Sequence, residues 1–474
     1  MLIAVIPLLL ALLGLFPRLA RWLPGMAAIL LLAQLPLVAW VCLPVLSGGM
    51  PSFSYFAIDG VGAVFTLITT LVAAAAMAQA AWLMPAERQG EHAVSDRWFC
   101  LFYSLSGLFL LAMYGVLLAQ HLGFLWIAME ATTLMSAPLI FHHRSRHALE
   151  ATWKYFLLCS VGIAFALFGT VLIFAAQHAD GTLAIGGLIA HADKLDPRLL
   201  RLGFIFCLIG YGTKAGLFPL HNWLPDAHSE APAPASAMLS GALLNCALVA
   251  IWRVVQITNA AGQGGLVRQL LVPAGAITVL AASLMLVRQH DLKRMWAYSS
   301  VEHVGLLTLA IGIGSGPIFM LHAFNHSIVK VALFLMAGNI LALYGTKYLN
   351  RLGSLLKVAP AWGIVLGAAT FAIVGSPPFG TFLSEWLLLR DTIGAGEYLA
   401  AAVVIIGLTI TCIAVTFHIG RVLFGHKAPV LQMQPARAWV VTPAVLLVFS
   451  LLSGVALSQP VMTMLAFLVK GGAK

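Results

Sequence analysis

The chain has 474 residues, of which 61% are hydrophobic and only 9% are charged, and its mean hydropathy is +0.98. These values exclude a soluble globular domain and predict an integral membrane protein with many spans. The formal charge of +10 does not indicate a nucleic-acid partner, because Lys and Arg fall in short loops between apolar stretches. The six cysteines stand singly in apolar sequence, so they predict neither a zinc site nor an iron–sulfur cluster.

Apolar stretches of about 20 residues predict an all-α protein with roughly fourteen transmembrane helices in the lipid bilayer. The first stretch lacks a charged start and a cleavage site, so we expect it to be retained as a span. The longest expected loop covers 177–202. The expected helices cover 1–17, 25–46, 56–84, 98–119, 121–141, 150–177, 200–224, 231–257, 268–288, 295–313, 316–344, 360–391, 397–424 and 438–458.

Lys and Arg are unevenly divided between the two sets of loops. Of the 26, sixteen follow odd-numbered spans, eight follow even-numbered spans, and Lys214 and Lys330 lie within spans. The positive-inside rule therefore predicts that the odd loops face the cytoplasm and that both termini face outward.

The first ionisable groups expected deep in the membrane are Glu130 in the fifth span and Lys214 in the seventh. A charge at this depth costs about 2.5 to 3.5 kcal/mol on insertion scales, so such groups usually have a role. Lys214 precedes Pro219, and a proline frees backbone carbonyls and leaves room for a polar cavity. The structural alternatives are a Glu130 carboxylate that bonds a neighbouring helix and a Lys214 without a functional role.

The eleventh span places four polar residues on one face, namely His322, Asn325, His326 and Lys330. At 1.5 Å per residue they extend over about 12 Å of depth, which favours a polar path along one helix. Zinc binding by His322 and His326 is an alternative, because their spacing suits it, but no nearby carboxylate or cysteine completes a set. We therefore expect no metal site.

The twelfth span is interrupted by GSPPFG at 375–380, shortly before Glu385. This interruption mirrors the one after Lys214, and two broken segments, one in each half, indicate an inverted-repeat transporter. The expected divisions are N-terminal helices in 1–97, two five-helix repeats in 98–257 and 258–425, and a last helix with its tail in 426–474.

Three further polar residues accompany the second half. His418 in the thirteenth span extends the second polar set toward one membrane face. Glu302 and His303 near the start of the tenth span are either polar packing groups or a lateral proton link.

Four stretches, in order along the chain, closely resemble one family: GYGTKAGLFPLHNWLPDAHSEAPAPASAMLSG, DLKRMWAYSSVEHVGLL, HAFNHSIVKVALFLMAG and GSPPFGTFLSE. The family is that of the antiporter-like membrane subunits of respiratory complex I, of group 4 membrane-bound hydrogenases and of Mrp cation/proton antiporters. Within it the chain is most similar to the hydrogenase 4 component F branch. The resemblance implies a fourteen-helix fold with two inverted five-helix repeats, each forming a proton half-channel, and with broken helices seven and twelve.

The resemblance also implies which residues move protons. Carried over by position, the proton-translocating residues are Glu130, Lys214, His322, His326, Lys330 and Glu385. Asn245 stands where complex I subunits usually have a second lysine, and asparagine cannot take a charge. The relay is therefore expected to have a gap between Lys214 and Lys330, which water or His322 would bridge.

From these features we expect a non-redox, proton-translocating subunit of an energy-converting oxidoreductase in the bacterial inner membrane, of the hydrogenase 4, formate hydrogenlyase or NADH:quinone oxidoreductase type. The chain carries no cofactor motif, so Ni–Fe and Fe–S groups, or flavin, are expected in partner subunits. The expected partners are antiporter-like paralogues, a quinone-site or hydrogenase-anchoring subunit, and peripheral redox subunits. An Mrp-like antiporter or inorganic-carbon transport subunit is a second interpretation, and a non-conducting scaffold is a third.

Overall fold

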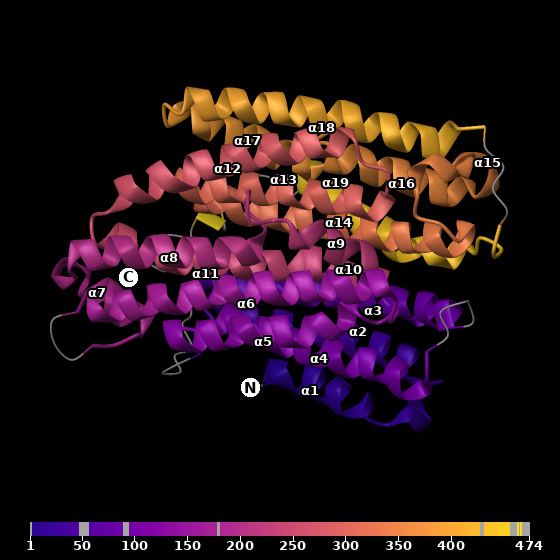
Figure 1. Ribbon diagram of the computed structural model, residues 1–474, viewed down its shortest axis with the longest axis horizontal. Helices are drawn as coiled ribbons and strands as arrows, with labels where there is room; N and C mark the ends of the chain where they lie inside the picture. The colour runs from indigo at the N-terminus through magenta and orange to yellow at the C-terminus, as the bar shows by residue number, and fades with distance from the viewer. Residues whose placement is uncertain are drawn as a thin grey trace.

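The computed structural model describes residues 2–46, 56–88, 94–177, 181–426 and 431–455, and the four positions 462, 463, 465 and 466. Its helices lie side by side along the longest axis of the molecule (Figure 1). The N-terminal helices occupy one side of this view, the C-terminal helices occupy the other, and α8 to α11 lie between them. Over the described ranges the β-contacts are isolated bridges between loops, so the all-α prediction is confirmed.

The helices have the following bounds. The first part of the chain forms α1 (Leu2–Leu13), α2 (Leu23–Leu46), α3 (Gly60–Arg88), α4 (Asp96–Leu118), α5 (Leu122–Ile140), α6 (Arg146–Ala175), α7 (Ile185–Ala190), α8 (Pro197–Ala215), α9 (Trp223–Glu230), α10 (Ala233–Met238) and α11 (Leu244–Ala260). The second part forms α12 (Gly264–Val287), α13 (Leu292–Gly312), α14 (Gly316–Tyr344), α15 (Leu355–Val358), α16 (Pro360–Ile373), α17 (Gly380–Gly394), α18 (Tyr398–Phe424) and α19 (Val441–Val455).

Many of these helices can cross a membrane. Ten candidate spans among the described residues are long and apolar enough to do so, which confirms a multi-span membrane protein. Helix α1 has 12 residues and is about 18 Å long, which is less than a hydrocarbon core of about 30 Å. The expected span at 1–17 is therefore shorter in the structure, and the total of fourteen spans stays a prediction.

The segment expected as a loop at 177–202 is partly helical. It contains α7 and the start of α8. Asp196 accepts hydrogen bonds from the backbone amides of Arg198 and Leu199, and Pro197 takes the first helical position. Both residue types favour helix initiation at these positions, so α8 begins earlier than its apolar character indicates.

Two breaks interrupt the helices where the sequence predicts them. Helix α8 ends before Gly216, which has a φ of 84°, and the chain becomes helical again at α9. Helix α16 is followed by Gly375, with a φ of 68°, and α17 begins at Gly380. Glycine adopts these left-handed conformations without strain, so both helices end there. The division of the chain into two repeats stays a prediction.

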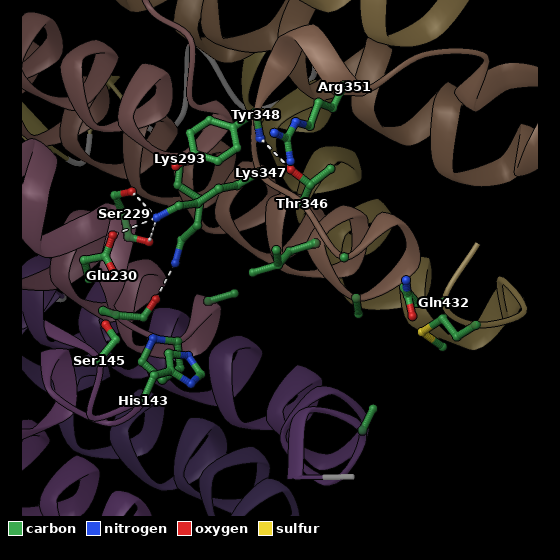
Figure 2. A pocket seen from close by; sticks show the side chains of 18 residues that line it. His143, Ser145, Ser229, Glu230, Lys293, Thr346, Lys347, Tyr348, Arg351 and Gln432 are labelled. Atoms are coloured by element: carbon green, nitrogen blue, oxygen red, sulfur yellow. Dashed lines mark hydrogen bonds and ion pairs between the residues drawn. The ribbon is translucent and has the colours of Figure 1, made fainter. Parts of the chain in front are cut away.

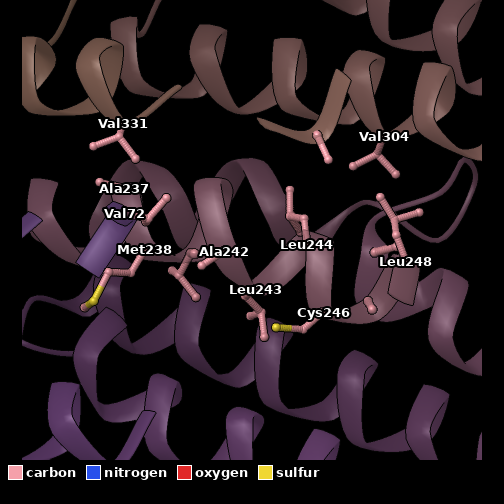
Figure 3. Packing of buried hydrophobic residues seen from close by; sticks show 14 of the residues in the cluster. Val72, Ala237, Met238, Ala242, Leu243, Leu244, Cys246, Leu248, Val304 and Val331 are labelled. Carbon is pink, nitrogen blue, oxygen red and sulfur yellow. The ribbon is translucent and has the colours of Figure 1, made fainter. Parts of the chain in front are cut away.

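The centre of the molecule is a continuous helix made of α10, a π-helical turn η3 (Leu239–Leu243) and α11. The apolar window of this helix is completely buried, whereas the windows of α6 and α18 are 39% buried. Val72 of α3, Val304 of α13 and Val331 of α14 lie around it (Figure 3). Because π turns occur frequently at functional sites, this segment is a candidate for a role beyond packing.

Candidate functional site

Lys214 lies in the last turn of α8, directly before the first break, and is fully buried. Its ammonium donates hydrogen bonds to the hydroxyls of Thr133 in α5, at 2.8 Å, and Tyr155 in α6, at 2.7 Å. It also lies 4.8 Å from the centre of the Tyr155 ring. A hydroxyl can accept from a charged amine and donate to a neutral one, so both protonation states of Lys214 find partners here.

Glu130 lies one helical turn before Thr133 in α5 and is half-buried. Its carboxylate accepts hydrogen bonds from Ser160, at 2.9 Å, and from Thr133, at 3.3 Å. Among the described residues it forms no direct ion pair with Lys214, because the Thr133 hydroxyl lies between the two groups. Glu130 and Lys214 are therefore connected indirectly, through the hydroxyl of Thr133.

Asn245 follows the π-helical turn at the start of α11 and is fully buried. Its amide donates to the Gly241 carbonyl at 3.0 Å and to the Ser327 hydroxyl in α14 at 2.7 Å. Its carbonyl oxygen has no hydrogen-bond partner within the described part of the chain. Asn245 is thus joined to the polar face of α14, one turn from Lys330, while no hydrogen bond between described residues joins it to Lys214.

The predicted polar face of α14 is buried along its whole length, at His322, Asn325, His326 and Lys330. His322 Nε2 lies 3.0 Å from Nδ1 of His303 in α13, and its Nδ1 lies 2.8 Å from the Ser384 hydroxyl in α17. The ring of His326 lies 5.2 Å from that of His303. The structure therefore brings His303 into the same cluster as the α14 histidines, although the sequence left its role open.

Glu385 lies in α17 just after the second break and is 6% exposed. One of its oxygens packs so closely on Gly375 that a Cβ at this glycine would overlap it. Its other oxygen, Oε1, has no hydrogen-bond partner among the described residues. Ligand atoms of His303, His322 and Glu385 all lie within 4.8 Å of one another. The carboxylate that the sequence did not place near His322 is thus supplied by α17.

Glu302 of α13 points into a second set of hydroxyls. Its carboxylate accepts a hydrogen bond from Ser283 in α12 at 3.3 Å, and Thr411 in α18 donates to Ser283 at 3.0 Å. Between described residues, no hydrogen bond joins His418, further along α18, to this set; one of its ring nitrogens lies 3.1 Å from the Val287 carbonyl at the end of α12. The polar groups therefore extend from Glu302 along α12 and α18.

Lys330 is fully buried and donates to the Trp296 carbonyl in α13 at 3.0 Å. One turn further along α14, Phe334 stacks on the ring of His228 in α9, with ring centres 4.9 Å apart. His228 is fully buried, and neither of its ring nitrogens has a hydrogen-bond partner within the described residues. His228 lies next to Ser229, which lines a cavity at one end of the molecule.

That cavity has a volume of about 950 Å³ and contains several polar side chains (Figure 2). Lys347 donates to the Ser229 hydroxyl at 2.7 Å and to Glu230 at 2.8 Å, and it lies 3.4 Å from Asp291. Burial favours the neutral amine, but Asp291 and Glu230 outweigh it and raise the pKa of Lys347. Lys293 donates to the Ala231 carbonyl. Most of the cavity lining comes from segments that follow odd-numbered expected spans, so these segments lie together at one end of the molecule.

Sequence reasoning missed the hydroxyl-bearing residues of the site. They are Thr133, Tyr155, Ser160, Ser283, Ser327, Ser384 and Thr411. In membrane helices most Ser and Thr hydroxyls bond their own backbone, so the sequence offers no sign of which ones reach another helix. Their contacts depend on helix rotation, which is set by tertiary packing.

Comparison with known proteins gives consistent results. A family profile described as NADH:quinone oxidoreductase/Mrp antiporter, TM, matches residues 119–411. A hydrogenase-4 component F homolog of Methylacidiphilum infernorum is 38% identical over 386 residues, which cover 79% of this chain and 80% of that protein. A Na(+)/H(+) antiporter subunit of Alkalihalophilus pseudofirmus is 32% identical over 66% of this chain and 40% of its own length.

A solved structure has the same fold. A chain of the membrane-bound sulfane sulfur reductase, an archaeal respiratory membrane complex, superposes with a TM-score of 0.86 at 25% identity. The match covers 100% of this chain and 96% of that chain.

Proposed function

Because the chain belongs to the NADH:quinone oxidoreductase/Mrp antiporter family of membrane proteins, we propose that it translocates protons as a non-redox subunit of an energy-converting oxidoreductase. The proposal places it in a bacterial inner membrane with both termini facing outward. The hydrogenase-4 component F homolog favours a hydrogenase-type complex. The electron-transfer centres, Ni–Fe and Fe–S or flavin, then belong to partner subunits, alongside other antiporter-like membrane subunits.

The observation that carries this proposal is the series of buried polar groups that crosses the molecule between the two helix breaks. It begins with Glu130 and Lys214 at the first break. Its next member is Asn245 at the central helix, which is hydrogen-bonded to α14 and not, among the described residues, to Lys214. It continues through His326, Lys330 and the paired His303 and His322 to Glu385 at the second break. Buried ionisable groups are costly in a membrane, and a series of them lining helix breaks is typical of an ion path.

The chemistry of the first cluster suits stepwise proton transfer. Lys214 can hold a proton or release it, and the hydroxyls of Thr133 and Tyr155 can both accept and donate. Movement of negative charge at Glu130 changes how well the ammonium form of Lys214 is stabilised, because the two groups share Thr133. We propose that this change drives the proton toward the α14 histidines.

Buried polar atoms without hydrogen-bond partners among the described residues indicate where water would complete the path. The carbonyl oxygen of Asn245, both ring nitrogens of His326 and Oε1 of Glu385 lack hydrogen-bond partners among the described residues. Buried polar groups are almost always satisfied, often by ordered water. We therefore propose that water bridges Lys214 to Asn245 and His326 to its neighbours.

Cation/proton antiport is the second candidate. The observation that favours it is the similarity to the Na(+)/H(+) antiporter subunit of Alkalihalophilus pseudofirmus, although the chain covers 40% of that protein. In this case ion exchange needs no redox partner. The polar groups described above serve either function.

Gentle purification from native membranes tests the proposal. We expect redox subunits to co-purify, together with nickel and iron or flavin, and we expect their substrate to drive proton movement in sealed vesicles. Sodium/proton exchange by the chain in vesicles without redox subunits would instead establish the antiporter. Assembly with redox subunits but no change in proton movement after Lys214→Ala would leave the scaffold as the remaining function.

A further inference from the structure

A cluster of metal-binding side chains lies within the buried polar series. We propose that His303, His322 and Glu385 bind a divalent transition-metal ion of the zinc class. The three side chains come from α13, α14 and α17, and their ligand atoms lie within 4.8 Å of one another. Two histidines and one carboxylate form a set that holds zinc in proteins. The binding does not depend on whether the chain moves protons.

The hydrogen bonds around the two histidines are those of metal ligands. One nitrogen of each ring faces the other ring, at 3.0 Å. The remaining nitrogen of His322 lies 2.8 Å from the Ser384 hydroxyl, and the backbone of Ile373 is hydrogen-bonded to the His303 ring. A ligating histidine typically donates its second N–H to such a partner, which fixes the ring and directs the free lone pair to the metal.

The third ligand is held in place and has a free oxygen. Glu385 packs on Gly375 through one oxygen, while its Oε1 lacks a hydrogen-bond partner among the described residues. Ligand atoms around a tetrahedral zinc ion lie about 3.4 Å apart, because each bond is about 2.1 Å long. The spacing in the structure, 4.8 Å at most, therefore needs only small side-chain rotations to close on an ion.

The surroundings favour a borderline metal over a hard one. Two imidazoles suit zinc, cobalt or copper, whereas magnesium and calcium prefer sets made of oxygen ligands. Glu302 interacts electrostatically with Glu385, so a second carboxylate offsets the double positive charge. The positive charge of the Lys330 ammonium opposes cation binding, but this ammonium is hydrogen-bonded to the Trp296 carbonyl.

Metal binding has a consequence that rests on the proposed function. A zinc ion on His322 and Glu385 takes the lone pairs that would receive a proton between α14 and α17. Zinc therefore stops proton movement through the second half of the chain.

The test measures zinc directly on the full-length chain in detergent. Zinc-loaded protein is passed over a weak chelator, the retained zinc is counted, and Co²⁺ is used as a spectroscopic probe of the ligand set. We expect one zinc ion per chain, undisturbed by excess magnesium. Loss of a residue that hydrogen-bonds to a metal ligand typically lowers metal affinity about 10- to 100-fold. Glu385→Gln and His322→Asn remove the ligands themselves, so we expect them to lower zinc affinity by about 100-fold or more.

Two further variants make the result decisive. Ser384→Ala keeps all three ligands and is expected to lower zinc affinity about tenfold through the freed His322 ring. His418→Ala removes a histidine of α18 outside the set and is expected to leave affinity unchanged. Equal zinc retention in all variants would show binding at surface histidines and overturn the proposal, as would loss of zinc in His418→Ala alone. A chain that moves no protons when it is free of zinc, yet binds zinc as expected, would refute the proposed function and leave the metal site intact.

Discussion

Asn245 of α11 donates a hydrogen bond to the hydroxyl of Ser327 in α14 over 2.7 Å. Ser327 itself donates to the Ala323 carbonyl at 2.6 Å, so its hydroxyl is already satisfied as a donor. The contact therefore serves the Asn245 amide, whose carbonyl oxygen stays free for water. Asn245 cannot carry charge, yet it connects the central helix to the face that bears His326 and Lys330.

The first prediction concerns this contact. Asn245→Leu removes the polar group and keeps the branching of the side chain, and Ser327 keeps its own backbone bond. We expect the thermal stability to be unchanged or slightly raised, because an orphaned polar atom is removed as well. Proton movement is expected to fall about tenfold or more, since the apolar side chain excludes the bridging water. Asn259→Leu, on an exposed position of the same helix, is the matched control, and equal proton movement in both variants would contradict the prediction.

Thr133 offers a test that leaves every charge in place. Thr133→Val preserves shape but removes the hydroxyl that links Lys214 to Glu130. We expect proton movement to fall about tenfold, which corresponds to the loss of one hydrogen bond of about 1.4 kcal/mol in the transfer step. The control is Thr132→Val, because among the described residues the Thr132 hydroxyl bonds the Met129 carbonyl of its own helix and no other helix. The two variants are compared in sealed vesicles at equal protein content, and a loss shared by both would show a packing effect.

Lys214 and Glu130 are expected to be essential. Lys214→Ala and Glu130→Gln should abolish proton movement, because each removes an ionisable group from the path. The complex should still assemble, because neither variant leaves a directly paired charge buried without its partner. Lys154→Ala serves as control, since Lys154 is a half-exposed residue paired with Glu150 and Asp226 at one end of the molecule. Proton movement and complex assembly are measured on the same vesicles. Normal proton movement in assembled Lys214→Ala would refute the assignment.

Much of the fold was predictable because the bilayer restricts it so strongly. A helix in a membrane must be long and apolar. Both helix breaks are indicated in the sequence by a glycine, Gly216 or Gly375, with prolines nearby. The start of α8 was less predictable, because Asp196 and Pro197 initiate a helix within polar sequence. The π-helical turn before Asn245 was not predictable, since no local signal in the sequence marks it; Gly241, within this turn, lies close to Val72 and Val331.

The site was predictable in its charged residues but not in its connections. Lys214, Lys330 and Glu385 stood out because charge is rare in apolar spans. The link through Thr133 and the approach of Glu385 to His303 depend on how α5, α13 and α17 are rotated. A sequence indicates the polar face of one helix, whereas the neighbour that meets this face is set by the whole fold.

Asp59 and Arg253 predict a pH dependence at the end of the molecule opposite the cavity. Arg253 is 2% exposed and binds both oxygens of Asp59, at 2.5 and 2.6 Å. Burial opposes ionisation of Asp59, but the Arg253 guanidinium outweighs it and holds the pKa of this carboxyl below its usual value. The lowered pKa of Asp59 stabilises the folded protein at pH values above the pKa of the unfolded chain, which is about 3.9. This stabilisation is lost as the pH falls through the pKa of the folded state.

The corresponding variant is Asp59→Asn. It leaves a buried guanidinium without its counter-charge, so we expect a loss of about 3 to 5 kcal/mol and a weaker acid dependence of the melting temperature. Glu150→Gln removes an exposed carboxylate that pairs with Lys154, and it is expected to leave stability nearly unchanged, because solvent screens exposed ion pairs. Melting curves in detergent from about pH 3 to about pH 7, a range that includes the ordinary Asp pKa, compare the two variants. Equal melting temperatures would contradict the role given to the pair.

Gly375 is expected to be irreplaceable because two requirements meet there. Its φ of 68° is unfavourable for other residues, and a Cβ would overlap Oε2 of Glu385. Gly375→Ala therefore strains the backbone by about 1 to 3 kcal/mol and pushes the carboxylate away from His303 and His322. We expect a lower melting temperature, reduced proton movement and weaker zinc retention together. Gly394→Ala, where no other described residue packs within 4 Å of the added Cβ, is the control for a glycine near a helix end. A Gly375→Ala protein that moves protons and retains zinc like the control would show that Glu385 acts from a position other than the one held by Gly375.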